Sequence, residues 1–177
     1  MATAPTSPTA STSTQPPAGA SNKELVLWTV EQINQRNLDG LREVYAPGMR
    51  ERFPDADLTG TDEIVEYFEG VFAAFPEFKL DIVAAAEEGE NVFIRWVLTG
   101  KHEGTFTGIE ATGKELRIDG MDNFVVRDGK LHSNFVVFDR MQFAQQLGVM
   151  PPDDSRQDRA MKALFNTKTK IAAKLKR

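Results

Sequence analysis

The chain has 177 residues, no cysteine and two histidines, which excludes disulfides, thiolate nucleophiles and a three-histidine metal centre. Its net charge of −5 is unevenly distributed. Residues 156–177 carry eight basic side chains and one acidic one, whereas the other residues carry 13 basic and 25 acidic ones. Because an acidic body repels phosphate backbones, we expect no nucleic-acid partner.

Residues 1–20 contain five Thr, three Ser, four Pro and no charged side chain. Such a segment buries too little apolar surface to offset its ordering entropy, so we expect a disordered tail. It lacks the apolar stretch of a signal peptide and the arginines of a transit peptide. We therefore expect a cytoplasmic protein.

Helical patterns fill the first half of the following region. Ser21 and Glu24 have the spacing of a capping box, and the apolar residues after them recur with a helical period. The sequence predicts helices over residues 21–33, 41–45 and 61–75, with an irregular segment at 48–60.

The apolar period then changes from helical to alternating, which indicates strands. Asp128-Gly129 is a strong signal for a two-residue hairpin turn. The predicted strands cover residues 78–84, 92–98, 116–126 and 131–138. Helices followed by an antiparallel meander indicate an α+β fold, in which the helices cover one face of a curved sheet.

This order of elements resembles the SnoaL-like polyketide cyclase family of the nuclear-transport-factor-like fold. The resemblance covers residues 22–152 and rests on the stretches GTDEIVEYFEGVFAAFP (60–76), GKHEGTFTGIEATGKEL (100–116), DNFVVRDGKL (122–131) and VFDRMQFAQQLGVMP (137–151). It implies a cone-shaped, curved and mostly antiparallel sheet wrapped by three N-terminal helices around a central pocket. It also implies homodimers that form through the sheet. We expect a domain over residues 21–152, followed by a basic tail over 153–177 that can be helical.

The resemblance further implies ring closure by an aldol reaction without metal or cofactor. Aligned through the DGK turn, the family's catalytic carboxylate in the last strand falls on Val136, its histidine one strand earlier on Asp122, and its glutamine on Gly120. The chain therefore departs from the cyclase pattern at the positions where the chemistry is carried out.

Asp122 shares strand parity with apolar residues such as Ile118 and Phe124, so its carboxylate should face the helix-covered side of the sheet. Desolvation there would raise its pKa and make it a proton shuttle near neutral pH. The alternative is a structural aspartate at the pocket rim that is bonded to an amide or a basic side chain.

Asn134 has the parity of Val136 on the neighbouring strand. Counting back from the Asp128-Gly129 turn places Asp122 opposite Phe135, with Asn134 close by. Asn134 could stabilise an enolate oxygen or orient Asp122, or it could be a polar group satisfied within the sheet. We expect the ligand to contact Asn134, Trp96, Phe124 and Val136, although Trp96 could instead simply fill the core, which is the more common role of a tryptophan.

Three further features leave alternatives open. His102 could be a catalytic acid or base at the pocket mouth, but the polar residues around it also fit an exposed strand end. Glu51, Asp55 and Asp57 are expected to form a solvated acidic loop, and we expect no metal site. The tail over 153–177 could lie on an anionic membrane or bind an acidic partner, or it could remain solvated.

These observations predict a cofactor-independent enzyme that cyclises or isomerises an apolar, carbonyl-bearing molecule by proton transfer. Asp122 would move the proton, and Asn134 or His102 would stabilise the oxyanion. The alternative is a non-catalytic module of the same fold that binds a hydrophobic ligand or dimerises. Steroid-type double-bond isomerisation would also need a buried acid such as tyrosine. The two tyrosines, Tyr45 and Tyr67, have helical apolar-face positions, and nothing in the sequence places either one beside Asp122.

Overall fold

A computed structural model of the chain describes residues 15–16 and 18–175. The disordered tail predicted for residues 1–20 lies largely outside the described residues. The elements follow the order α1 (Asn22–Asn34), α2 (Leu38–Val44), β1 (Tyr45–Arg52), β2 (Asp57–Thr59), α3 (Thr61–Ala74), β3 (Lys79–Glu88), β4 (Asn91–Lys101), β5 (Glu115–Arg127), β6 (Lys130–Phe138), α4 (Arg140–Leu147) and α5 (Arg156–Leu175).

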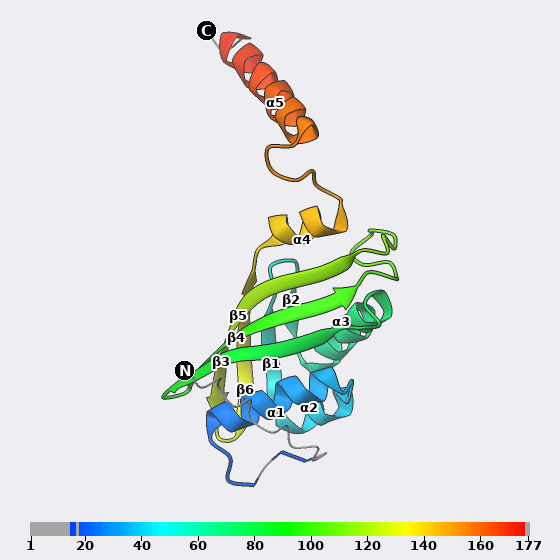
Figure 1. The fold of residues 1–177 in the computed structure, drawn as a ribbon. Helices are drawn as coiled ribbons and strands as arrows, with labels where there is room; N and C mark the ends of the chain where they lie inside the picture. Colours follow the sequence, from blue (N-terminus) through cyan, green and yellow to red (C-terminus); the bar gives the residue numbers. More distant parts are fainter. Residues whose placement is uncertain (1–14, 17, 176–177) are drawn as a thin grey trace, which may run out of the picture.

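The strands form one curved sheet in the order β2-β1-β6-β5-β4-β3, in which β1 runs parallel to β6 and the other neighbours are antiparallel. Helices α1, α2 and α3 lie over the same concave face, while β3, β4 and β5 curve around them (Figure 1). The predicted α+β cone fold is therefore confirmed. The capping box at the start of α1 is also present, with the Ser21 hydroxyl accepting from the Glu24 amide and the Glu24 carboxylate accepting from the Ser21 amide.

The segment expected to be irregular is mostly strand. Residues 45–52 form β1, so Tyr45 begins a strand and does not end a helix. Pro47 and Gly48 indicated the end of a helix. They lie instead in a register irregularity of β1 between Tyr45 and Arg50, where a proline can be accommodated. From Met49 onward, buried and exposed side chains alternate. This alternation places Glu51 on the buried face.

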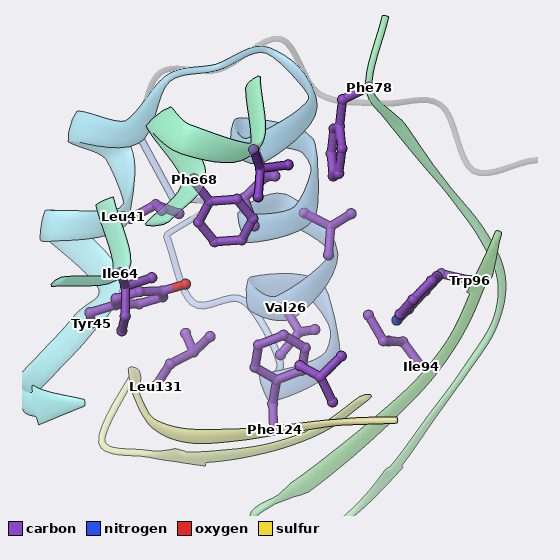
Figure 2. Packing of buried hydrophobic residues seen from close by; sticks show 14 of the residues in the cluster. Val26, Leu41, Tyr45, Ile64, Phe68, Phe78, Ile94, Trp96, Phe124 and Leu131 are labelled. Carbon is purple, nitrogen blue, oxygen red and sulfur yellow. The ribbon is translucent and has the colours of Figure 1, made fainter. Parts of the chain in front are cut away.

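A continuous hydrophobic core joins the helices to the sheet. Val26 on α1 and Ile64 on α3 pack toward Phe124 and Leu131, which project from the paired strands β5 and β6 (Figure 2). Trp96 projects from β4 into the same interior. Side chains from the helices and the sheet therefore share one interior.

The C-terminal part of the chain extends away from this body. Asp139 is the N-cap of helix α4, and its carboxylate accepts hydrogen bonds from the amides of Met141 and Gln142. Helix α5 projects from the far side of α4 without covering the sheet (Figure 1). Among the described residues, no helix combines the length and the apolar character that a membrane span requires.

Candidate functional site

A hydrogen bond between two neighbouring strands fixes the first part of the site. The Trp96 indole Nε1 donates to Oδ1 of Asp122 over 2.8 Å. Gly120, two residues before Asp122, stands directly opposite Trp96 in the β4–β5 pair. A Cβ atom at Gly120 would come within 2.1 Å of the indole ring. The missing side chain therefore lets the ring lie flat across β5 and reach the carboxylate.

Asn134 connects Asp122 to a second carboxyl group. Its Nδ2 donates to Oδ2 of Asp122 over 3.2 Å and to Oε1 of Glu51 over 2.9 Å. The strand pairing explains this bridge, because Asn134 on β6 pairs with Glu51 on β1 and with Phe124 on β5. Asn134 is only 4% exposed and Glu51 only 2% exposed. The arrangement is thus a buried row of carboxylate, amide and carboxyl across three strands.

A bulge places these groups on one face. The β5–β6 pairing begins as predicted, with Arg127 opposite Lys130, but the register shifts by one residue beyond Val126. Asp122 therefore faces Val136, and the expected pairing with Phe135 is wrong. A one-residue shift reverses the face on which every later side chain lies. Without it, Phe135, which is 44% exposed, would point inward in place of Asn134.

Burial controls the ionisation of both carboxyl groups. It raises the pKa of Asp122 to about 6, although the hydrogen bonds from Trp96 and Asn134 oppose the rise. It raises the pKa of Glu51 to about 8, opposed by the Asn134 hydrogen bond and reinforced by the charge of Asp122. These shifts favour an ionised Asp122 beside a protonated Glu51 near neutral pH. Two carboxyl groups whose pKa values are driven apart are a common arrangement for acid–base chemistry.

The carboxyl groups line a largely apolar cavity of about 100 Å³. A single water needs only about 10–15 Å³, so the space can hold a small organic group. Aromatic and aliphatic side chains from α1, α3, the sheet and α4 make up most of the wall. All of the expected ligand-contacting residues are in it, namely Trp96, Phe124, Asn134 and Val136, as is Asp122.

His102 lies outside this wall. The expectation of an exposed strand end is wrong, because the side chain is fully buried. Its ring stacks on Phe75 with centroids 5.1 Å apart, and Nδ1 lies 3.1 Å from the Thr112 hydroxyl. The loop around Gly104 bonds to the end of α3, which encloses the histidine. His102 therefore stacks on Phe75, a cavity residue, and is not itself part of the cavity wall.

Two functional candidates were missed from the sequence. Glu51 was expected in a solvated loop with Asp55 and Asp57; those two are exposed, but Glu51 is buried in the cavity wall. The available signal was the alternation from Met49 onward, which the preceding Pro47-Gly48 obscured. Tyr45 is buried too, and its hydroxyl has no hydrogen-bond partner among the described residues.

Tyr45 lies within electrostatic range of the site. Burial, and then the charges of Glu51 and Asp122, raise its pKa well above the ordinary value. Figure 2 shows its hydroxyl directed into the packed interior from the side of α2 and β1. Tyr45 is not part of the cavity wall, whereas Tyr67 is. The prediction that Tyr45 lies on a helix is wrong, because it is the first residue of β1.

Comparison with known proteins gives the same fold. AclR from Streptomyces galilaeus, a candidate hydroxylase, matches with 25% identity and a TM-score of 0.66 over 88% of this chain and 94% of its own. A candidate SnoaL-like polyketide cyclase from Jannaschia sp. CCS1 matches with 23% identity and a TM-score of 0.68 over 73% and 93%. IdmH from Streptomyces antibioticus, a candidate polyketide cyclase, matches with 23% identity and a TM-score of 0.64 over 73% and 99%.

No curated protein sequence matches the chain significantly. The sequence profile of the SnoaL-like polyketide cyclases, however, matches residues 23–147, which is most of the chain and includes all but the first residue of α1 and every element from α2 to α4. The chain belongs to the SnoaL-like polyketide cyclase family.

Proposed function

We propose that the protein is a cofactor-independent enzyme that cyclises or isomerises an apolar, carbonyl-bearing small molecule by proton transfer. The observation that carries this proposal is the Asp122 carboxylate, which lies in an apolar cavity and is held by two neutral donors, Trp96 and Asn134. A desolvated carboxylate with a pKa of about 6 is ionised at neutral pH and basic enough to remove a proton next to a carbonyl.

The departure from the family pattern supports a relocated base. The resemblance places the family's carboxylate at Val136, and Val136 directly faces Asp122 across the β5–β6 pair. Side chains opposite each other in such a pair have Cβ atoms about 4.5–5.5 Å apart. Moving the carboxylate from one member of the pair to the other would keep it in the same part of the cavity.

The composition of the wall supports the choice of ligand. The cavity presents large apolar surfaces and few polar groups, an arrangement typical of sites that bury a hydrophobic ligand and orient it at one end. Phe124 and Val136 would contact the body of the ligand, and Trp96 would contact its end near Asp122.

A non-catalytic, ligand-binding or dimerising module of the same fold is the second candidate. The apolar Val136 at the family's catalytic position favours it, as do the exposed apolar side chains on the outer face of the sheet, namely Val83, Phe93, Met121, Phe135 and Val137. We propose that this outer face forms a homodimer in either case, and that the protein acts in the cytoplasm.

The test is exchange of α-protons in a simple bicyclic ketone. In D₂O, the wild-type protein should accelerate deuterium uptake by 2-tetralone, measured by proton NMR, with a rate that rises as Asp122 ionises near pH 6. Asp122→Asn should lower the catalysed rate about 100-fold or more. Asp119→Asn is the matched control, because Asp119 lies on the same strand but is exposed.

A wild-type rate in Asp122→Asn would refute Asp122 as the base. Tight binding of 2-tetralone by the wild-type protein without any exchange would instead favour the non-catalytic module.

A further inference from the structure

Glu51 is a buried carboxyl group of the cavity wall that has no role in the mechanism proposed above. Its Oε1 accepts the hydrogen bond from Asn134, whereas Oε2 is buried and has no partner among the described residues. None of the ion pairs in the described part of the chain involves Glu51. Burying an unpaired carboxylate is costly, so this environment favours the neutral acid.

The donors around the two carboxyl groups determine which of them holds the charge. Asp122 accepts from both Trp96 and Asn134, whereas Glu51 accepts from Asn134 alone. Hydrogen bonds to the charged form stabilise it, so Asp122, which accepts more of them, is favoured as the carboxylate. Oε1 of Glu51 already accepts a hydrogen bond, as the carbonyl oxygen of a carboxylic acid does, so Oε2 is the oxygen that would carry the proton of a neutral Glu51. The unpartnered atom is thus a hydrogen-bond donor without an acceptor.

We propose that Glu51 is the general acid of this site, and that it donates its Oε2 proton to the carbonyl oxygen of the substrate. This inference rests on the proposed function. As Asp122 takes a proton from the carbon beside the carbonyl, the C–H electrons form the carbon–carbon double bond of an enol, and the carbonyl oxygen takes the proton of Glu51. Asp122 becomes neutral and Glu51 becomes the carboxylate. The return steps restore both groups, so no proton is gained or lost.

Asn134 lowers the free-energy cost of moving the negative charge from one carboxyl group to the other. It donates to both carboxyl groups before and after the transfer, so the negative charge moves from Asp122 to Glu51 without losing its amide partner. The same pair defines the substrate class. A neutral ketone offers an acceptor to Glu51 and an acidic C–H to Asp122, whereas an anionic ligand would meet the charge of Asp122.

The first test does not depend on turnover. Infrared spectra near neutral pH should show the carbonyl stretching band of a protonated carboxylic acid, and Glu51→Gln should remove it. Glu66→Gln is the control, because Glu66 is an exposed glutamate of α3. A wild-type protein without the band, or a band that survives in Glu51→Gln, would overturn the proposal.

Ligand binding tests the contact to oxygen. 2-Naphthol has the shape of the enol of 2-tetralone, and naphthalene is the same ligand without oxygen. Glu51→Ala should weaken binding of 2-naphthol at least about tenfold more than binding of naphthalene. Equal losses for both ligands would contradict a contact between Glu51 and oxygen. If Glu51→Ala does not fold, Glu51→Met serves in its place, because methionine fills a similar volume and has no donor for the ligand oxygen.

Exchange kinetics separate this inference from the proposed function. Glu51→Ala should slow deuterium uptake by 2-tetralone about 100-fold, the typical effect of removing one oxyanion donor, and Glu51→Gln should slow it less. Wild-type rates in both variants, with Asp122→Asn inactive, would overturn the role of Glu51 and leave Asp122 as the base. If even the wild-type protein gives no exchange, the proposed function fails, and Glu51 as the general acid fails with it. The infrared and binding results would then show only whether Glu51 is protonated and contacts oxygen.

Discussion

At the scale of single residues, the contact between Gly120 and Trp96 has the sharpest steric requirement in the site. The indole occupies the space where any other residue at position 120 would place its Cβ atom. The ring cannot simply move aside, because its Nε1 is bonded to Asp122 and the residue lies in the middle of β4. The glycine therefore serves packing here, without any unusual backbone conformation.

Gly120→Ala should lower the free energy of unfolding by about 1–3 kcal/mol, the typical penalty for overpacking a core. Gly70→Ala is the control, since no atom lies within 4 Å of its Cβ position on α3, and it should stabilise the protein by up to about 1 kcal/mol. Urea unfolding of the two variants measures both effects. A Gly120→Ala variant that is as stable as the wild-type protein would show that the indole ring of Trp96 is free to move.

The ionisation of Glu51 should make stability depend on pH. Between about pH 5 and 8, the folded protein holds a proton that the unfolded chain has lost, because burial raises the folded-state pKa to about 8. Unfolding then releases a proton, so stability should fall by up to about 1.4 kcal/mol per pH unit as the pH rises through this window. Glu51→Gln should flatten that decline in urea titrations, and an unchanged slope would show that Glu51 is already ionised.

At the scale of elements, the alternating patterns predicted the four long strands and the hairpin at Asp128-Gly129, and the parity of Asp122 indicated a buried carboxylate. Two irregularities limited the rest. The bulge in β6 shifts the register by one residue, and no residue type marks it in the sequence. Pro47-Gly48 resembled a terminator, so β1 and its buried Glu51 were not recognised. Both failures concern backbone pairing between distant segments, which local patterns do not encode.

Helix α4 links a local cap to the cavity. Asp139 caps it through two amide hydrogen bonds, and Phe143 on the same helix lines the cavity. Asp139→Ala should lower the free energy of unfolding by about 1 kcal/mol and also weaken ligand binding. Asp139→Asn should restore most of both, since asparagine caps helices nearly as well. If ligand affinity falls in Asp139→Ala and recovers in Asp139→Asn, the capped helix α4 closes the site.

At the scale of the whole molecule, the chain consists of an acidic body and a basic, amphipathic extension. Apart from Asp158, the side chains of residues 156–174 on helix α5 are exposed, including apolar ones such as Leu164 and Phe165. Its start is capped locally, with the Ser155 hydroxyl accepting from the Asp158 amide. The helix therefore depends on its own sequence and on whatever it contacts in solution, more than on packing against the body.

Truncation after Pro152 should accordingly leave the free energy of unfolding of the domain unchanged, within about 0.5 kcal/mol. It should also reduce the binding of apolar dyes, because it removes exposed apolar side chains. Chemical denaturation and dye fluorescence of the truncated and full-length chains measure the two effects. A large loss of stability would show that α5 packs on the domain or on a second copy of it.

The hydrogen bond from Trp96 to Asp122 also gives the molecule its own optical probe. The chain contains only two tryptophans, Trp28 and Trp96. In a Trp28→Phe variant, all indole emission would come from the ring that donates to the Asp122 carboxylate. Protonation of that carboxylate, or entry of a ligand beside it, would alter the surroundings of the indole. Compounds could then be screened by fluorescence alone, before any turnover is known.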